Sequence, residues 1–103
     1  IESTFASDPY EQMGGYLKRC LGMNMYVKLE NPKGMRVQDL FINNELMDEE
    51  KTYHACFVTV QGVPKKYGRN RRNLDISAID ALKQYLSKNE SVSPVLRNTV
   101  QLI

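Results

Sequence analysis

The sequence predicts an α+β domain with a mixed sheet of four to five strands and one main helix. Strand-like runs bounded by Gly, Pro and Asn recur through residues 16–61 and again at the C-terminal end. Only residues 73–88 space their apolar side chains at the helical period. The 103 residues match a single domain, 1–103, because this length is near the commonest domain size and no linker or repeat interrupts it.

Met23–Glu30 has the clearest strand pattern, since apolar residues alternate with polar or aromatic ones along it. The alternation predicts a half-buried strand with its methionines in the core. Turn chemistry follows at Asn31–Gly34, and Asn43-Asn44 can adopt the left-handed conformations of a tight hairpin. Shorter strands are expected at Tyr16–Leu21, Val37–Ile42, Glu45–Met47 and Thr99–Ile103.

Thr52–Gln61 is the longest strand-like run, and Gly62 and Pro64 end it. Apolar residues occupy both of its alternating faces, which predicts a central strand covered on both sides. One helix cannot supply that cover. We therefore expect part of a helix within Ile1–Gln12, or completion of the surface by another domain or chain.

The predicted helix begins at a cap provided by Asn73 or Asp75 and runs to about Lys88, where Asn89 can stop it. Lys residues in its C-terminal half suit the helix dipole. Its apolar face consists of Ile76, Ile79, Leu82, Tyr85 and Leu86.

Two cysteines, Cys20 and Cys56, are too few for a disulfide framework. Both fall in predicted strands, so we expect two buried thiols, with one bridge between neighbouring strands as the alternative. The net charge of +2 does not by itself indicate a nucleic-acid partner. No apolar run is long enough for a membrane span, and the first ten residues do not resemble a signal peptide.

The sequence shows no complete catalytic centre and no metal site. The single histidine, His54, has no nearby nucleophile pattern and is interpreted as structural or surface-exposed. Gly14-Gly15 lacks the other features of a phosphate loop. The adjacent acids Asp48–Glu50 lack the spacing of a calcium loop and are expected to form a solvated turn.

The loop Gly62–Arg72, which carries five cations, remains as a candidate site. Such a loop can hold phosphate or sulfate oxygens, with Tyr67 and Phe57 offering ring faces to a base. Two other interpretations stay open. The loop can be a solvated turn that keeps a sheet edge soluble, or a weak nucleic-acid contact.

Several segments occur in an order that resembles a known family. They are Asp8–Tyr16 (DPYEQMGGY), Arg19–Met23 (RCLGM), Tyr26–Pro32, Gly34–Val37 (GMRV), Lys51-Thr52-Tyr53 and the helix with Ala81-Leu82 and Tyr85-Leu86. Together they resemble the C-terminal, substrate-binding domain of the 5′-nucleotidase superfamily of two-metal phosphoesterases. The resemblance covers nearly the whole chain.

The resemblance implies a hydrolase of two domains. An upstream metallophosphoesterase domain would carry a pair of divalent metals and perform hydrolysis, and the present domain would bind a nucleotide or related phosphoester. This chain would then be inactive alone, without cofactor, and N-terminally truncated, with Ile1-Glu2-Ser3 as the end of a lost helix. The family also implies a secreted, periplasmic or cell-surface protein.

The chain departs from typical nucleotidases after its Tyr53 strand. It lacks their Gly-Gly-Asp-Gly loop and has Val60 near the position of their base-stacking aromatic. Ala55–Val60 is closer to the superfamily's sulfur-oxidation branch, with Phe57 at a Trp position. A relative of those hydrolases and a non-catalytic interaction module are thus alternatives. The predicted substrate-binding residues are Phe57, Gln61, Lys65, Tyr67 and Arg69.

Overall fold

The computed structural model describes residues 1–12, 19–60 and 63–103. They divide into two compact units, each described by itself: Ile1–Cys56 with Arg97–Ile103, called the sheet unit, and Phe57–Leu96, called the helix unit. The prediction of one domain over the whole chain stays a prediction. No helix among the described residues is long and apolar enough to cross a membrane.

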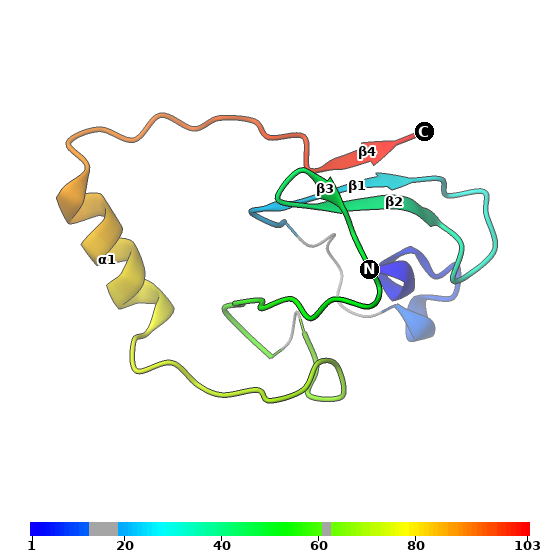
Figure 1. Cartoon of the computed structure of the whole chain (residues 1–103), viewed down its shortest axis with the longest axis horizontal. Coiled ribbons are helices and arrows are strands. Elements are labelled where there is room, and N and C mark those ends of the chain that lie inside the picture. Colours follow the sequence, from blue (N-terminus) through cyan, green and yellow to red (C-terminus); the bar gives the residue numbers. More distant parts are fainter. Residues whose placement is uncertain (13–18, 61–62) are drawn as a thin grey trace. The chain divides into compact units, whose positions relative to one another are not determined.

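The described chain is α+β, with a four-stranded mixed sheet and one α-helix, as the sequence predicts (Figure 1). The sheet has the order β3-β2-β1-β4. β1 pairs with β2 in the antiparallel sense and with β4 in the parallel sense, and β2 pairs with β3 in the antiparallel sense. The strands are β1 Met23–Val27, β2 Val37–Ile42, β3 Glu45–Leu46 and β4 Val100–Leu102.

β1 supplies the centre of the core. Met25 and Val27 are almost completely buried, as the alternating pattern predicts, and Ala6 is buried too. The side chains of Asn24 and Tyr26 belong to the opposite face of the strand, because successive residues of a strand alternate between faces. β1 ends at Val27 and is shorter than the predicted Met23–Glu30, since its pairing with β2 becomes irregular between Tyr26 and Val27.

The β2–β3 hairpin turn has the predicted chemistry. Asn43 and Asn44 both have positive φ angles, 52° and 68°, which a two-residue hairpin requires and asparagine tolerates. The backbone N–H of Asn43 also donates to the carbonyl of Gly22 at 2.9 Å, which ties the turn to the start of β1. The hairpin end of the sheet is therefore fixed by backbone interactions.

Glu2 ties the N-terminal segment to the turn between β1 and β2. It begins the 3-10 helix Glu2–Phe5, and its carboxylate accepts backbone N–H bonds from Gly34 (3.1 Å), Arg36 (2.8 Å) and Val37 (2.8 Å). Burial acts to raise the pKa of Glu2, but these three hydrogen bonds and the Arg36 charge together lower it below its ordinary value. The expected helix end at residues 1–3 is thus a single 3-10 turn.

A second 3-10 helix, Pro9–Glu11, follows Asp8. The Asp8 side chain caps it by accepting from the N–H of Tyr10 at 2.9 Å. The segment Ile1–Gln12, where the sequence predicts part of a helix or else cover from another domain or chain, thus holds two short 3-10 helices.

The predicted central strand Thr52–Gln61 is wrong over its described residues. Thr52–Val60 forms no strand, and its side chains are exposed, with Val58 at 78%. A strand needs partners for its backbone hydrogen bonds, and β1 and β2 occupy the interior positions of the described sheet. Gln61 and Tyr16–Lys18 lie outside the described residues, and Arg19–Leu21 is not a strand.

The helix α1, Ala78–Lys88, ends where predicted, with Asn89 as its C-cap. Its N-cap is Ser77 and not Asn73 or Asp75. Ser77 Oγ accepts from the N–H of Asp80 at 3.1 Å and donates to its carboxylate at 2.8 Å, a reciprocal cap that neither predicted residue forms.

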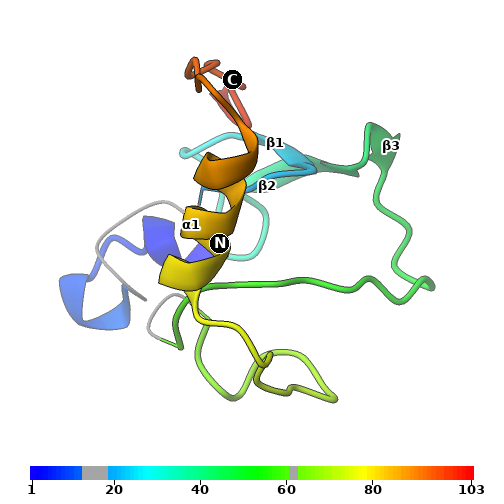
Figure 2. The same cartoon turned by 90° about the vertical axis from the view of Figure 1, so that its left-hand side faces the viewer.

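The apolar face of α1 has no cover among the described residues of the helix unit. Extended segments flank the helix on both sides (Figures 1 and 2), and none of its residues is buried. Its large apolar side chains are about half exposed or more: Ile79, Leu82, Tyr85 and Leu86.

Candidate functional site

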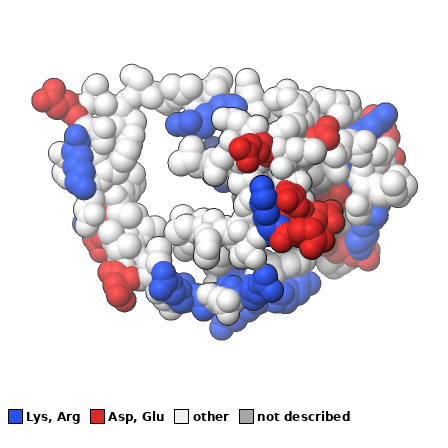
Figure 3. Space-filling model, in the orientation of Figure 1, with Lys and Arg blue, Asp and Glu red and all other residues white. Residues whose placement is uncertain are grey.

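The predicted site lies in the helix unit, on the segment Val63–Arg72, here called the basic loop. A turn opens it, in which the N–H of Tyr67 donates to the carbonyl of Pro64 at 3.0 Å. Gly68 and Asn70 then take positive φ angles of 76° and 54°. Lys and Arg side chains of this loop gather along the lower edge of the view in Figure 3.

Arg71 organises the basic loop from within. Its guanidinium donates to the backbone carbonyls of Val63 (2.8 Å), Pro64 and Tyr67 (3.0 Å). The same group lies over the ring of Phe57, 4.6 Å from its centroid, in a cation–π contact. Arg71 therefore closes the loop and covers one face of Phe57, so this cation is committed to structure and not open to a ligand.

The structure places four of the five predicted substrate-binding residues in or beside this loop. Phe57, Lys65, Tyr67 and Arg69 are exposed, and Arg71 links Phe57 to Tyr67. Lys66 Nζ lies 5.2 Å from the centroid of the Tyr67 ring. The fifth, Gln61, lies outside the described residues. Substrate binding by these residues stays a prediction.

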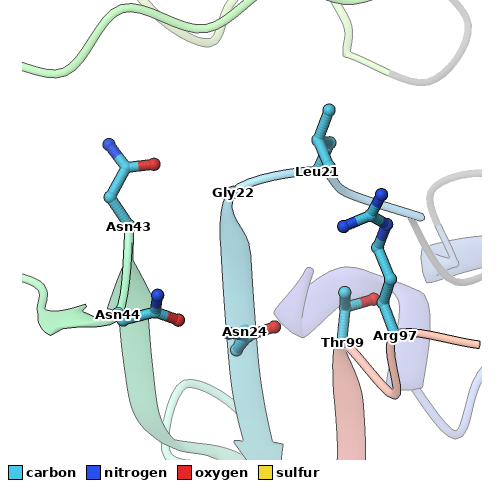
Figure 4. Close-up of a pocket in the computed structure, with 7 residues that line it drawn as sticks. All are labelled: Leu21, Gly22, Asn24, Asn43, Asn44, Arg97 and Thr99. Atoms are coloured by element: carbon cyan, nitrogen blue, oxygen red, sulfur yellow. The ribbon is translucent and has the colours of Figure 1, made fainter.

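The sheet unit carries a hollow that the sequence reasoning missed (Figure 4). It has a volume of about 540 Å³ and lies at the hairpin end of the sheet. Asn24 of β1 lies between Asn44 of the hairpin and Thr99 just before β4, and the Arg97 side chain extends toward Leu21. The lining residues are Leu21, Gly22, Asn24, Asn43, Asn44, Arg97 and Thr99.

A second hollow of about 250 Å³ adjoins the first and shares Asn24, Asn44 and Arg97 with it. We call the two together the sheet groove. Tyr26 and Phe41 add aromatic rings, which meet edge to face with centroids 6.1 Å apart. Asn98 and Gln101 complete this lining.

Sequence reasoning missed the groove because its residues carry other signals. The asparagines of the hairpin are typical turn residues, and Arg97 is an isolated cation distant in sequence from β1. The parallel pairing of β4 with β1 brings Arg97 beside Asn24, and no local pattern predicts such a pairing. Only the alternation that places Asn24 and Tyr26 on one face was a usable signal.

The other residues that could carry chemistry are the acids, the single histidine and the cysteines. No group of three or more His, Cys, Asp or Glu residues there is arranged to hold a metal ion. Asp48–Glu50 forms an exposed turn, as expected, in which Asp48 Oδ1 accepts from the N–H of Glu50 at 3.0 Å. His54 is exposed.

Neither cysteine forms a disulfide, so the alternative of one bridge is not realised. Cys20 is half-buried, and burial raises the pKa of its thiol. Cys56 is exposed, which corrects the expectation of a buried thiol. Its exposure follows from the absence of the predicted Thr52–Gln61 strand, which would have placed it in a sheet.

Comparisons with protein-family models, with curated proteins and with solved structures found no match for this chain.

Proposed function

We propose that this chain is the substrate-binding domain of a two-metal, 5′-nucleotidase-like hydrolase that acts on nucleotides or related phosphoesters. Hydrolysis and the metal pair belong to an upstream domain, and no residue here is assigned as a metal ligand. The parent protein would work outside the cytoplasm, as the resemblance implies.

The observation that carries the proposal is the contact between Glu2 and the Gly34–Val37 turn. The Gly-Met-Arg-Val segment carries part of the resemblance, which also implies that Ile1-Glu2-Ser3 ends a helix of the same domain, and Glu2 and Gly34 are 32 positions apart in sequence. A shared family fold requires its motifs to assemble into one unit. The hydrogen bonds between Glu2 and this segment join them in one unit, which supports the proposal.

The basic loop supports an anionic substrate. Lys65, Lys66 and Arg69 are exposed on a loop without acidic residues, and charge-assisted hydrogen bonds to phosphate oxygens are stronger than neutral ones. Arg71 holds the backbone of the loop in place, which lowers the entropy lost when a ligand orders the loop. One face of the Phe57 ring is occupied by Arg71, so a base would stack on the other.

An NMR titration tests this assignment. AMP, a UDP-sugar, inorganic phosphate and thiosulfate are added in turn to the isotope-labelled chain. We expect saturable shifts of backbone signals in Val63–Arg72, and we expect the double variant Lys65→Ala/Arg69→Ala to lose them. Lys83→Ala, on the exposed helix α1, is the matched control and should behave as the wild type.

The ligand that the chain prefers distinguishes a nucleotidase from a relative of the sulfur-oxidation hydrolases. Preference for AMP supports a nucleotidase, whereas preference for thiosulfate supports the sulfur-oxidation branch. Shifts confined to other surfaces would remove the basic loop from the site.

A second candidate function is a non-catalytic interaction module, which the exposed apolar face of α1 favours. In this case the helix docks on another domain and the chain binds no nucleotide. A dye that fluoresces on apolar surface should then bind the wild type and bind Leu82→Glu/Leu86→Glu less well. Equal dye binding by both proteins would count against the helix face as the docking surface.

A further inference from the structure

We propose that the sheet groove is a binding site for a small sugar that carries one acidic group, either a carboxylate or a phosphate. The inference concerns the sheet unit alone and goes beyond the proposed function, which rests on the basic loop. It starts from the size of the groove. The hollows of about 540 and 250 Å³ adjoin, and their combined size is in the range of small-molecule sites.

The charge of the lining indicates an anion. Among the described residues that line the groove, Arg97 carries the only charge, and it borders both hollows. A guanidinium presents a planar fork of donors that matches the two oxygens of a carboxylate or phosphate. One such cation, with no acid among the described lining residues, suits a ligand with one acidic group.

The amides of the lining indicate hydroxyl groups on the ligand. The side chains of Asn24, Asn43 and Asn44 make no hydrogen bond to other described residues, so their donors and acceptors are available. A primary amide offers two donors and an acceptor at neighbouring positions. This arrangement pairs well with adjacent hydroxyls of a sugar, each of which donates and accepts.

The aromatic rings supply the apolar side of the site. Tyr26 and Phe41 lie on the same face of the sheet, and the Tyr26 hydroxyl accepts a long hydrogen bond, 3.4 Å, from Gln101 Nε2. Their mutual edge-to-face packing holds the rings in place. Rigid rings can pack against the C–H surface of a sugar while the amides bind its hydroxyls.

The walls of the groove are held by the backbone before any ligand arrives. Asn43 and Asn44, whose backbone is in the left-handed conformation, form one wall. The hydrogen bond from the Asn43 N–H to the Gly22 carbonyl ties this wall to the start of β1. On the other wall, the N–H of Met25 donates to the Thr99 carbonyl at 2.8 Å. Preorganised walls reduce the ordering cost of binding.

Titration with three sugars tests the proposal: glucuronate, glucose 6-phosphate and uncharged glucose. The readout is the backbone and side-chain amide signals of Asn24, Asn44 and Thr99. We expect saturable shifts with an acidic sugar and weaker binding of glucose. Glucuronate and glucose 6-phosphate together show which acidic group the groove prefers, and inorganic phosphate alone shows whether the sugar contributes.

Matched variants locate the ligand. Arg97→Ala should weaken binding of the acidic sugar by about tenfold or more, as loss of a charge-assisted hydrogen bond predicts. Arg19→Ala, an exposed arginine outside the groove, should bind as the wild type. Unchanged signals of Met25 and Val27 verify that Arg97→Ala is folded.

Three results would overturn the inference. They are the absence of shifts in the groove, equal binding of glucose and acidic sugars with no effect of Arg97→Ala, and stronger binding of a single-stranded oligonucleotide. The double variant Lys65→Ala/Arg69→Ala changes no residue that lines the groove. If this variant fails to bind AMP, the result bears on the basic loop alone. Failure of the two proposals can thus be told apart.

Discussion

The sheet unit and the helix unit are stabilised by interactions of different range. In the sheet unit, residues far apart in sequence bury one another, as Met25 does beside Leu40 and Val100. In the helix unit, most of the described contacts are local, such as the cap of Ser77 on Asp80 and the bonds of Arg71 to its own loop, and the contact of Arg71 with Phe57 reaches further along the chain. The difference indicates that a sheet core holds the first unit, whereas caps and single side chains hold the second.

The largest expected effect is therefore on the sheet core. Met25→Ala removes a side chain that is only 1% exposed, and it should lower the free energy of unfolding by about 2–5 kcal/mol. Denaturant unfolding followed by amide signals of β1 and β2 measures it.

Leu82→Ala on α1 is the matched control. Its side chain is 56% exposed, so the same truncation should leave the sheet signals unfolding at the wild-type denaturant concentration. If the two variants destabilise the sheet equally, the contrast between the units is wrong.

The next effect concerns Glu2. Replacement by Ala leaves the N–H groups of Gly34, Arg36 and Val37 without their acceptor and should cost about 1.5 kcal/mol, at the low end for charged hydrogen bonds because the group is partly solvated. Denaturant unfolding of the wild type and of Glu2→Ala measures this decrease in the free energy of unfolding.

The contribution of Glu2 should also depend on pH. Since its pKa is lower in the folded protein than in the unfolded chain, its stabilisation is present above the unfolded pKa and disappears as the pH falls through the lowered, folded pKa. Wild type and Glu2→Ala should therefore converge in stability in acid. A difference that stays constant across this range would contradict the hydrogen-bonded carboxylate.

A smaller and local effect is expected from Arg71→Ala. Loss of its bonds to Val63, Pro64 and Tyr67 should lower the free energy of local opening of the basic loop by about 1 kcal/mol. The free energy of unfolding of the sheet should not change. Hydrogen exchange of the Tyr67 amide measures this opening. Arg72→Ala, next in sequence and exposed, is the control and should leave that exchange unchanged.

The smallest effect is at the cap of α1. Ser77→Ala removes the acceptor for the Asp80 N–H and should lower helix stability by about 0.5 kcal/mol, the low end for caps because the helix is exposed. Circular dichroism should show reduced helicity. Asp75→Ala, at a residue that the sequence suggests as the cap, should show no reduction in helicity.

Local patterns predicted the elements whose conformation depends on nearby residues. The alternation at Met23–Val27, the Asn43-Asn44 turn and the end of α1 at Lys88 all agree with the structure. Each follows from backbone preference or side-chain period, which a single sequence displays.

Long-range pairing explains the errors. The run at Thr52 is as strand-like as β1, but a strand also requires a neighbour, and no local pattern shows which runs find one. The same limit hid the sheet groove, because the β1–β4 pairing brings Arg97 to Asn24. The sequence shows the cluster of positive charge in the basic loop. It does not show that Arg71 binds the backbone carbonyls of its own loop.

One measurement tests the central proposal, recognition of a phosphoester without its hydrolysis. Phosphorus NMR of AMP is recorded with the chain present, before and after addition of Zn²⁺. We expect the AMP signal to shift or broaden on binding and inorganic phosphate to remain absent. Release of phosphate by the pure chain, or an AMP signal unaffected by it, would contradict a substrate-binding domain that leaves catalysis to another domain.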